Sequence, residues 1–485
     1  MKSEIKNICC IGAGYVGGPT MAVIAYKCND IVVNVVDSNK SRIDSWNNDD
    51  LKELPIYEPG LDKIISKTRN KNLFFSTNIE KNISNADLIF ISVNTPTKTN
   101  GLGAGKASDL KWVELCTRKV AKFSLGHTIV VEKSTLPVRT AEVIKEILYK
   151  AQGESANTKN PKTFDVLSNP EFLAEGTAIN DLLEPDRVLI GGEDQESTKT
   201  LSKIYENWIP KEKILLTNLW SSELAKLIAN AFLAQRISSI NSVSALCEKT
   251  GANINQVSKA IGLDKRIGDR FLKSGPGFGG SCFQKDILNL VYLSEYFGLP
   301  EVSKYWEEVI KINNWQRKRI YRLIVERLFG TISQKKIVIL GFAFKANTND
   351  TRESSAISIC KDLIEEGAEL VIHDPKVSPL QIEIELGMKP FSEMKNDNID
   401  YPKNYLGNWR FSENLNIFDN AHAVLVLTEW DDYKNIEWDY VVKKMIKPAW
   451  VFDARSIVNV DLVKKSGLNM WSLGDGNSKD EISGF

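Results

Sequence analysis

The sequence predicts an α/β protein in which two doubly wound domains are joined by a long central helix and a helical middle domain. A glycine-rich strand–turn–helix pattern lies near the N-terminus, and the same order of apolar runs returns from Lys335. A helical pattern of about thirty residues lies between the two. We expect domains over residues 1–217, 218–329 and 330–485.

Composition excludes several classes of protein. The chain has 485 residues, 42% of them hydrophobic, and equal totals of 62 basic and 62 acidic residues, so no net charge attracts nucleic acid or an anionic membrane. No apolar run reaches the roughly 18 residues of a membrane span. Seven cysteines form no C-x-x-C pair. We therefore expect reduced thiols, no metal site and a cytoplasmic location.

The first unit carries a dinucleotide-binding pattern. An apolar run over residues 6–11 leads into G-A-G-Y-V-G, and the next apolar run ends at Asp37, twenty residues beyond Gly17. This is the Rossmann fingerprint, in which a pyrophosphate lies on the helix N-terminus and the acid binds a ribose. An acid there favours NAD over NADP. The cofactor residues expected here are Gly12, Gly14, Tyr15, Val16, Gly17, Asp37 and Arg42.

Later strands of this unit end in polar residues. The runs over residues 86–93 and 127–132 continue into N-T-P-T and K-S-T-L-P, which makes Val93, Thr95 and Thr135 candidates for the cofactor crevice. Ordinary turn and cap chemistry explains the threonines equally well. Glu171 and Glu175, in N-P-E-F-L-A-E-G, would share a face if that segment were helical, and one could then act as a base. A solvated face is the alternative.

The central helix is expected to end near Gly251 and to serve as a spine and dimer interface. Lys226 and Asn230 lie four apart among apolar residues. Lys226 is either a surface residue with a buried stem or a functional cation.

A glycine loop precedes one cysteine. Residues 273–286 place four glycines within six positions just before Cys282, and Ser281 and Gln284 have capping-box spacing. We expect Cys282 in the first turn of a helix, where the helix dipole and Lys285 favour its thiolate, with the glycines letting a ligand approach the backbone. A buried, inert cysteine is the alternative. Arg266, Phe271 and Lys273 lead into the loop and could hold an anionic or aromatic ligand.

The second unit repeats the first with a different turn. Its first two apolar runs end at G-F-A-F-K and at Asp374, and Phe344 and Lys345 replace the later fingerprint glycines. A lysine in this turn can bind a diphosphate, so we expect the second unit to bind a different nucleotide from the first. Arg352 and Arg455 are further cations. Residues 395–416 are expected to form a loop insertion, and residues 474–485 a frayed tail.

Together these motifs resemble the nucleotide-sugar dehydrogenases of the UDP-glucose/GDP-mannose dehydrogenase family, and most closely its eukaryotic UDP-glucose 6-dehydrogenase branch. The matching stretches, in the family's order, are G-A-G-Y-V-G-G-P-T, Y-E-P-G-L, S-V-N-T-P-T, E-K-S-T, N-P-E-F-L-A-E-G, the Lys226/Asn230 helix, G-F-G-G-S-C-F-Q-K-D, G-F-A-F-K and D-T-R-E-S. Ala454 and Ser456 depart from the family pattern around Arg455.

The resemblance implies a four-electron oxidation of UDP-glucose to UDP-glucuronate by NAD. Cys282 would form a thiohemiacetal and then a thioester, with Lys226 and Asn230 at the oxyanions. Asp286 and Thr135 would hold water, and Glu171 would assist proton transfer. Glu175, Lys285 and Arg352 would reach the cofactor. The substrate residues implied are Glu171, Phe172, Leu173, Lys226, Asn230, Arg266, Phe271, Lys273, Phe278, Gly279, Phe344, Lys345 and Arg455.

Other interpretations of the sequence differ in substrate or in class. A relative acting on GDP-mannose or UDP-N-acetylmannosamine would keep the chemistry. A two-electron 3-hydroxyacid dehydrogenase fits the first domain but needs neither Cys282 nor a second nucleotide domain. A non-catalytic NAD-binding scaffold is disfavoured by the cysteine–lysine–aspartate set. The resemblance also implies a homo-oligomer, either a dimer or a hexamer.

Overall fold

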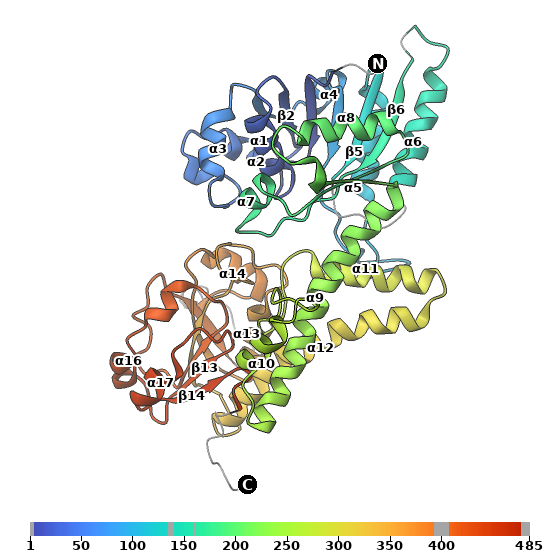
Figure 1. Cartoon of the computed structure of the whole chain (residues 1–485). Coiled ribbons are helices and arrows are strands. Elements are labelled where there is room, and N and C mark those ends of the chain that lie inside the picture. Colours follow the sequence, from blue (N-terminus) through green and yellow to red (C-terminus); the bar gives the residue numbers. More distant parts are fainter. Residues whose placement is uncertain (1–3, 134–139, 160, 392–406, 477–485) are drawn as a thin grey trace. The chain divides into compact units, whose positions relative to one another are not determined.

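The computed structural model describes residues 4–133, 140–159, 161–391 and 407–476. The chain forms two compact units, each built around a mostly parallel sheet (Figure 1). The first unit comprises Met1–Asn230 and Leu288–Phe297, and the second comprises Ala231–Ile287 and Gly298–Phe485. Two helices contribute residues to both units: α9 (Leu219–Thr250) and α11 (Phe283–Tyr296). The α9 bounds confirm the long central helix.

Within the described residues, the first sheet has eight strands in the order β3-β2-β1-β4-β5-β6-β7-β8, and only β6 and β7 pair antiparallel. Its strands are β1 (Asn7–Ile11), β2 (Val32–Val36), β3 (Leu73–Ser76), β4 (Leu88–Ile91), β5 (His127–Glu132), β6 (Thr163–Ser168), β7 (Val188–Gly192) and β8 (Ile214–Thr217). The register sets the ends of neighbouring strands level, since Ile11 pairs with Val36 and Ile91, and Glu132 pairs with Ile91 and Ser168. The residues that follow these strands therefore share one edge of the sheet.

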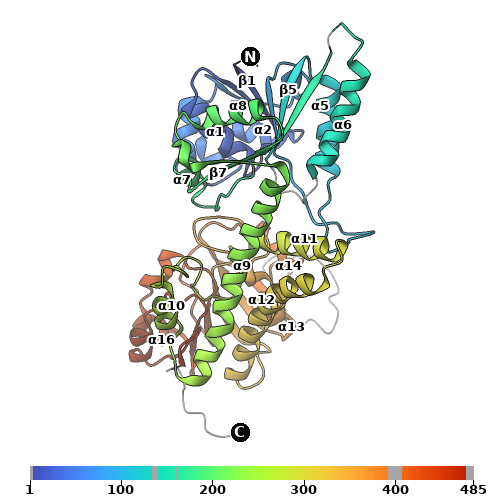
Figure 2. The same ribbon diagram turned by 45° about the vertical axis from the view of Figure 1, so that its right-hand side comes forward.

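Helices cover both faces of this sheet. One apolar core lies beneath α1, α3, α7 and α8, and another beneath α4, α5 and α6 (Figures 1 and 2). The helical elements of this unit are α1 (Gly17–Lys27), α2 (Lys40–Asn47), η1 (Leu51–Glu53), α3 (Leu61–Thr68), α4 (Ile79–Ser84), α5 (Lys111–Phe123), α6 (Thr140–Ser155), α7 (Ala178–Leu183), α8 (Gln195–Tyr205) and η2 (Lys211–Lys213). Burial on both faces explains why the strands are nearly continuous apolar runs.

The glycine turn between β1 and α1 is packed too closely for side chains. Gly12 has φ +113°, and a Cβ there would overlap the carbonyl oxygen of Ser92. A Cβ at Gly17 would overlap the carbonyl oxygen of Gly12. Trp46 lies against the same turn and donates from Nε1 to the Ala13 carbonyl oxygen at 3.0 Å. The fingerprint glycines at positions 12 and 17 therefore hold helix and strand together.

The second sheet repeats the strand order of the first. Its described strands run β11-β10-β9-β12-β13-β14, all parallel, which matches the first six positions of the N-terminal sheet and confirms the predicted repeat. They are β9 (Lys336–Leu340), β10 (Glu369–His373), β11 (Asn408–Phe411), β12 (Ala423–Val426), β13 (Trp450–Asp453) and β14 (Asn469–Ser472). The helical elements are α10 (Ile254–Gly262), α12 (Pro300–Arg327), α13 (Ser355–Glu365), α14 (Pro379–Leu386), η3 (Asp431–Asn435), α16 (Trp438–Lys444) and α17 (Val460–Lys465).

Two predictions about the C-terminal part were wrong where the structure describes it. The expected loop over residues 395–416 contains the edge strand β11, anchored by the buried Trp409, whose Nε1 donates to the Met388 carbonyl oxygen at 3.0 Å. The expected frayed tail begins with ordered residues, since Gly474 N–H donates to Glu248 Oε1 at 2.8 Å and Gly476 N–H donates to the Ala252 carbonyl oxygen at 2.8 Å. Residues 477–485 lie outside the described residues.

Gly17→Ala is expected to lower the stability of the first unit by about 2 kcal/mol or more, because the new methyl group has no room beside the Gly12 carbonyl. Gly14→Ala is the matched control, since no atom lies within 4 Å of a Cβ built there. Urea unfolding followed by tryptophan fluorescence checks the pair. Equal midpoints for the two variants would contradict the packing argument.

Candidate functional site

The turn after β1 and the acid after β2 form one hydrogen-bonded unit. Asp37 Oδ2 accepts from Ala13 N–H at 3.0 Å and from Arg42 Nη1 at 3.0 Å, while Oδ1 accepts from Asn39 N–H at 2.9 Å. Gly14 is partly exposed above the turn. The structure thus brings the turn and Asp37 together, and Arg42 lies beside Asp37.

Other predicted cofactor residues follow the neighbouring strands. Val93 and Thr95 come just after β4, at the same sheet edge as Gly12 and Asp37, and the Thr95 side chain is buried. Tyr15 and Val16 are partly exposed in the turn before α1. Thr135, predicted at both the cofactor and the catalytic site, lies outside the described residues.

A buried ion pair lies in the first unit. Lys226 Nζ is 3.2 Å from Glu171 Oε1, and these side chains are only 5% and 6% exposed. The other carboxylate oxygen of Glu171 accepts from Leu173 N–H at 2.7 Å. Asn230, one turn further along α9, is also buried. Lys226 is therefore no solvated surface lysine, and four of the predicted site residues share this region.

The segment that carries Glu171 is not helical, so the condition under which Glu171 and Glu175 would share a helical face is not met. Residues 171–174 have no regular structure, and a turn follows before α7. Glu58, from the Y-E-P-G-L motif, holds the far end, with its carboxylate accepting from Gly176 N–H at 2.7 Å and Ala178 N–H at 3.2 Å. Hydrogen bonds to Glu58 replace helical ones, and the Y-E-P-G-L motif was the only sequence signal that pointed to this glutamate.

Aromatic and cationic groups surround the same segment. The Phe172 ring lies beneath the Arg187 guanidinium, with its centre 3.7 Å from the guanidinium carbon. The same ring centre is 5.4 Å from Lys226 Nζ. Burial lowers the pKa of Arg187. Leu173 packs on the apolar core of the first unit. The Glu171 carboxylate thus pairs with Lys226, and the Phe172 ring lies beside the same lysine.

Cys282 immediately precedes α11, and its carbonyl oxygen accepts from Asp286 N–H at 2.8 Å. It is therefore the N-cap residue, one position before the expected first turn. Ser281 Oγ lies 3.4 Å from Cys282 Sγ instead of forming the expected capping box. Cys282 is partly exposed. The thiol thus lies at the positive end of a helix, next to helix N–H groups that have no partner within α11.

Side chains of the second unit fix the glycine loop before Cys282. Asn313 of α12 accepts from Phe278 N–H at 2.8 Å and donates to its carbonyl oxygen at 3.2 Å. Arg317 donates to the carbonyl oxygens of Phe278, at 2.7 Å, and Glu353, at 2.8 Å. Burial lowers the pKa of Arg317. Asn313 and Arg317 were not among the predicted site residues. The sequence signal that could have indicated them is the mostly polar stretch N-N-W-Q-R within an amphipathic helix.

The loop glycines allow close packing within the second unit. A Cβ at Gly279 would lie 2.6 Å from the Glu353 carbonyl oxygen, and one at Gly280 would lie 3.2 Å from the Phe344 ring. The missing side chains at these two positions therefore admit Glu353 and Phe344. Phe278 itself is buried and meets Phe283 edge to face at 5.9 Å.

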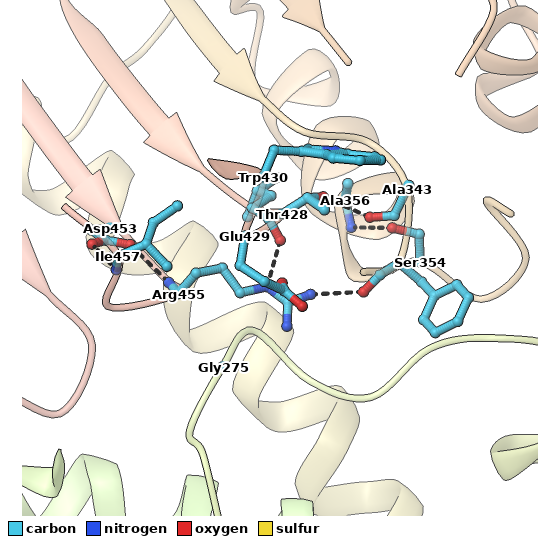
Figure 3. Close-up of polar contacts among 12 residues, drawn as sticks. Gly275, Ala343, Ser354, Ala356, Thr428, Glu429, Trp430, Asp453, Arg455 and Ile457 are labelled. Atoms are coloured by element: carbon cyan, nitrogen blue, oxygen red, sulfur yellow. Dashed lines mark hydrogen bonds and ion pairs between the residues drawn. The ribbon is translucent and has the colours of Figure 1, made fainter. Parts of the chain in front are cut away.

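Arg455 joins the loop to the carboxyl edge of the second sheet. It follows β13, and its guanidinium lies beside Glu429, with Nε 3.1 Å from Oε2, and donates to the Phe344 carbonyl oxygen at 2.8 Å (Figure 3). Gly275 lies under the same side chain. Lys345 Nζ lies 5.5 Å from the Phe344 ring centre. The predicted residues Phe344, Lys345 and Arg455 are thus brought together.

Asp374 follows β10 as Asp37 follows β2, but its carboxylate is used internally. Oδ2 accepts from Phe342 and Ala343 N–H groups and from Trp430 Nε1, and Oδ1 accepts from Lys376 and Val377 N–H groups. The residue is buried. Both of its carboxylate oxygens are thus bound within the second unit, where they close the turn after β9.

The remaining predicted residues lie on loops of the second unit or on α11. Arg266 is exposed and forms a two-oxygen pair with Asp264, which raises the pKa of Arg266. Arg352 makes the same kind of pair with Asp350. Phe271 has φ +62° and is 39% exposed. The other three are Lys273, which is exposed, Lys285, which is partly exposed, and Asp286, which is buried.

Within the described residues, no group of three or more histidine, cysteine or acidic side chains could hold a metal ion. No helix in this part of the chain has both the length and the apolar character that spanning a bilayer demands.

Comparisons with known proteins cover nearly the whole chain. Models of the NAD binding, central and UDP binding domains of the UDP-glucose/GDP-mannose dehydrogenase family match residues 6–209, 220–315 and 338–460. The UDP-glucose 6-dehydrogenase of Bos taurus is 56% identical over 460 residues, 94% of this chain and 90% of that protein. UDP-glucose 6-dehydrogenase 4 of Arabidopsis thaliana is 54% identical over 483 residues, 96% of this chain and 97% of that protein.

A solved structure agrees with this result. The UDP-glucose dehydrogenase of Pyrobaculum islandicum has a TM-score of 0.80 to this chain at 28% identity, and the match covers 98% of both chains.

Iodoacetamide is expected to modify Cys282 before the other thiols. Burial raises the pKa of Cys9 to about 12 and the pKa values of Cys28 and Cys116 to about 11, and it also raises those of Cys10, Cys247 and Cys360. Peptide mapping after brief labelling at pH 7.5 checks the order. Cys282→Ser should lose the fast label and Cys116→Ser should retain it; fast labelling elsewhere would contradict this ranking.

Proposed function

This chain belongs to the UDP-glucose/GDP-mannose dehydrogenase family, and we propose that it oxidises UDP-glucose to UDP-glucuronate with two molecules of NAD. Its first unit matches the family's NAD binding domain. Relatives named UDP-glucose 6-dehydrogenase share over half of its sequence across nearly the full length. The substrate and the covalent mechanism are the proposed parts.

One observation carries the covalent mechanism: Cys282 is a partly exposed thiol at the start of α11, in a loop fixed by Asn313 and Arg317. Burial raises the pKa values of the other six cysteine thiols, of which Cys116 is partly exposed and the other five are buried. A thiol that is accessible, rigidly held and next to a helix N-terminus suits a nucleophile.

The first unit fits NAD. Close packing at Gly12 and Gly17, open space at Gly14 and the Asp37 carboxylate at the next strand end form the expected cradle. When bound, NAD would accept the hydride in each of the two oxidations. The protein would bind the pyrophosphate on the N-terminus of α1 and the ribose hydroxyls at Asp37.

The residues of the chain would carry the remaining chemistry. In the first oxidation the C6 hydroxyl of glucose loses its proton to the protein, and the alcohol becomes an aldehyde. The Cys282 thiolate then forms a C–S bond to the aldehyde carbon, and Lys226 stabilises the oxyanion that results. The second oxidation makes a thioester. Water held by Asp286 then breaks the C–S bond, which releases the carboxylate and regenerates the thiol.

The second unit supplies the groups expected to hold the UDP. Phe344 offers a ring, and Lys345 and Arg455 offer cations beside the glycine loop. Arginine and lysine at a loop are the usual partners of a diphosphate. Arg352 and Lys285 belong to the proposed cofactor side, and Arg266, Phe271 and Lys273 belong to the proposed substrate side.

We propose a homo-oligomer in the cytoplasm as the working form. Large apolar side chains remain exposed on α12, with Val302 at 41%, Tyr305 at 55% and Trp315 at 41%, and on α9, with Phe232 at 55%. Exposed apolar groups of this size on helices favour burial against another copy. The free cysteines are consistent with a reducing compartment.

Wild-type protein is expected to form two NADH per UDP-glucose consumed, because an alcohol loses four electrons on the way to an acid. Absorbance at 340 nm against product quantified by chromatography gives the ratio. A ratio of one, with free aldehyde as product, would overturn the four-electron proposal.

Cys282→Ser is expected to lower the steady-state rate by at least about a thousand-fold, since the serine hydroxyl is a far weaker nucleophile than the thiolate. Mass spectrometry should find a covalent sugar nucleotide adduct on Cys282 in the wild type during turnover. Cys116→Ser, the matched control, should turn over like the wild type. Normal turnover by Cys282→Ser would rule out covalent catalysis.

The sugar is tested by competition. UDP-glucose is expected to give a kcat/KM at least about a hundred-fold above those of GDP-mannose and UDP-N-acetylmannosamine. A higher kcat/KM for GDP-mannose or UDP-N-acetylmannosamine would contradict UDP-glucose as the substrate and assign that sugar nucleotide instead.

A further inference from the structure

A second buried lysine lies at the end of the strand next to the one that leads to Glu171. Lys133 directly follows β5 and is 4% exposed. Its Nζ donates to Asn169 Oδ1 at 3.0 Å and to the Tyr205 hydroxyl at 3.3 Å, and that hydroxyl donates to the same Asn169 oxygen at 2.6 Å. The three side chains form a closed triangle beneath the carboxyl edge of the sheet.

This triangle holds the segment that carries Glu171. Asn169 comes directly after β6, two residues before Glu171, and donates from Nδ2 to the Leu189 carbonyl oxygen at 2.8 Å. Its backbone N–H donates to the Glu132 carbonyl oxygen at 2.9 Å. With Asn169 fixed on three sides, Pro170 leaves little freedom before Glu171. The position of the Glu171 carboxylate therefore depends on Lys133.

The lysine has neutral hydrogen-bond partners within the described residues. Burial and then Glu223 raise the pKa of its chain neighbour Glu132, which favours the uncharged form of that carboxyl. Burying an ammonium group among amides and hydroxyls is unfavourable, and methionine would fill the space without that penalty. A stability role alone does not explain a lysine here.

Charged groups do face Lys133 from other elements. Burial lowers the pKa of Lys133 to about 8, Glu171 and the Cys10 thiol raise it, and Lys226 lowers it. The pKa of Cys10 and that of Tyr205 are themselves raised by burial, so both are neutral at pH 7. The charges that matter to Lys133 are thus those of the Glu171–Lys226 pair.

We propose that Lys133 is a positioning residue for the oxidation, which fixes Glu171 through Asn169 and adds positive charge behind the Glu171–Lys226 pair. This inference rests on the proposed function. With Lys133 protonated, the group holds two cations and one carboxylate, so an oxyanion formed beside Lys226 is stabilised. Deprotonation of Lys133 at higher pH removes that excess charge.

The experiment compares three variants by kcat, by KM for UDP-glucose and by pH profile from 6.5 to 9.5. Lys133→Met is expected to lower kcat at pH 7 by about 10- to 100-fold, with smaller changes in KM, because the carboxylate is displaced and the positive charge behind the ion pair is lost. The deficit should shrink above about pH 8, where the wild type also loses the charge. Lys133→Arg, which stays charged, should recover part of kcat and remove the shift near pH 8.

Lys162→Met is the matched control. Lys162 precedes β6 at the opposite end of the strand, and its Nζ donates to the carbonyl oxygens of Ala121, at 2.8 Å, and Lys122, at 2.7 Å. It is therefore a lysine anchored on neutral groups in the same unit. Its substitution should leave kcat and the pH profile at wild-type values.

Hydrogen exchange provides a readout that does not need turnover. In Lys133→Met and not in Lys162→Met, peptides covering residues 169–177 should exchange at least about ten-fold faster. If wild-type protein forms no NADH from UDP-glucose, the proposed function fails, and exchange alone decides whether Lys133 positions the segment. Unchanged exchange, or a kcat deficit equal at every pH and not relieved by Lys133→Arg, would overturn the inference. Failure of Lys133→Met to fold leaves the decision to Lys133→Arg, whose pH profile must then differ from that of the wild type.

Discussion

The buried ion pair between Lys226 and Glu171 is the constraint on which the first unit's site depends. Two charges that are about one-twentieth exposed are stable only when each is held at close range. The long helix α9 fixes the lysine. The carboxylate lies on an irregular segment, so other groups must fix it, and the structure supplies Asn169 at one end and Glu58 at the other. Removing either anchor would leave a buried charge without a defined partner.

The two sheets show how one architecture serves different ligands. Both have the same strand order, and each has an acid after its second strand. Asp37 accepts from one N–H group of the turn, from Asn39 and from Arg42, whereas both Asp374 oxygens are taken up by backbone N–H groups and Trp430. The turns differ too, because the second unit lacks the later fingerprint glycines and has Phe344 and Lys345 in its turn.

Sequence patterns predicted the regular parts well. Apolar periodicity located the strands that lead to Gly12, Asp37 and Lys133, as well as the α9 helix, since both faces of the sheets are buried. Local rules failed where long-range contacts replace local ones. The segment after Asn169 resembles a helix in spacing but is held by Glu58, and Ser281 lies beside a thiol instead of capping the helix. The edge strand β11 was missed because its partners are distant in sequence.

Residue types at fixed local spacing were enough to predict the repeated domain pattern, the NAD fingerprint, the family and a cysteine at the start of a helix. Which polar side chains are buried, and what they contact, follows instead from how distant segments pack in the folded chain. Lys133, Glu58, Asn313 and Arg317 look like ordinary surface residues in the sequence. Their roles arise because the fold removes them from water, and a polar group without water must find a partner within the protein.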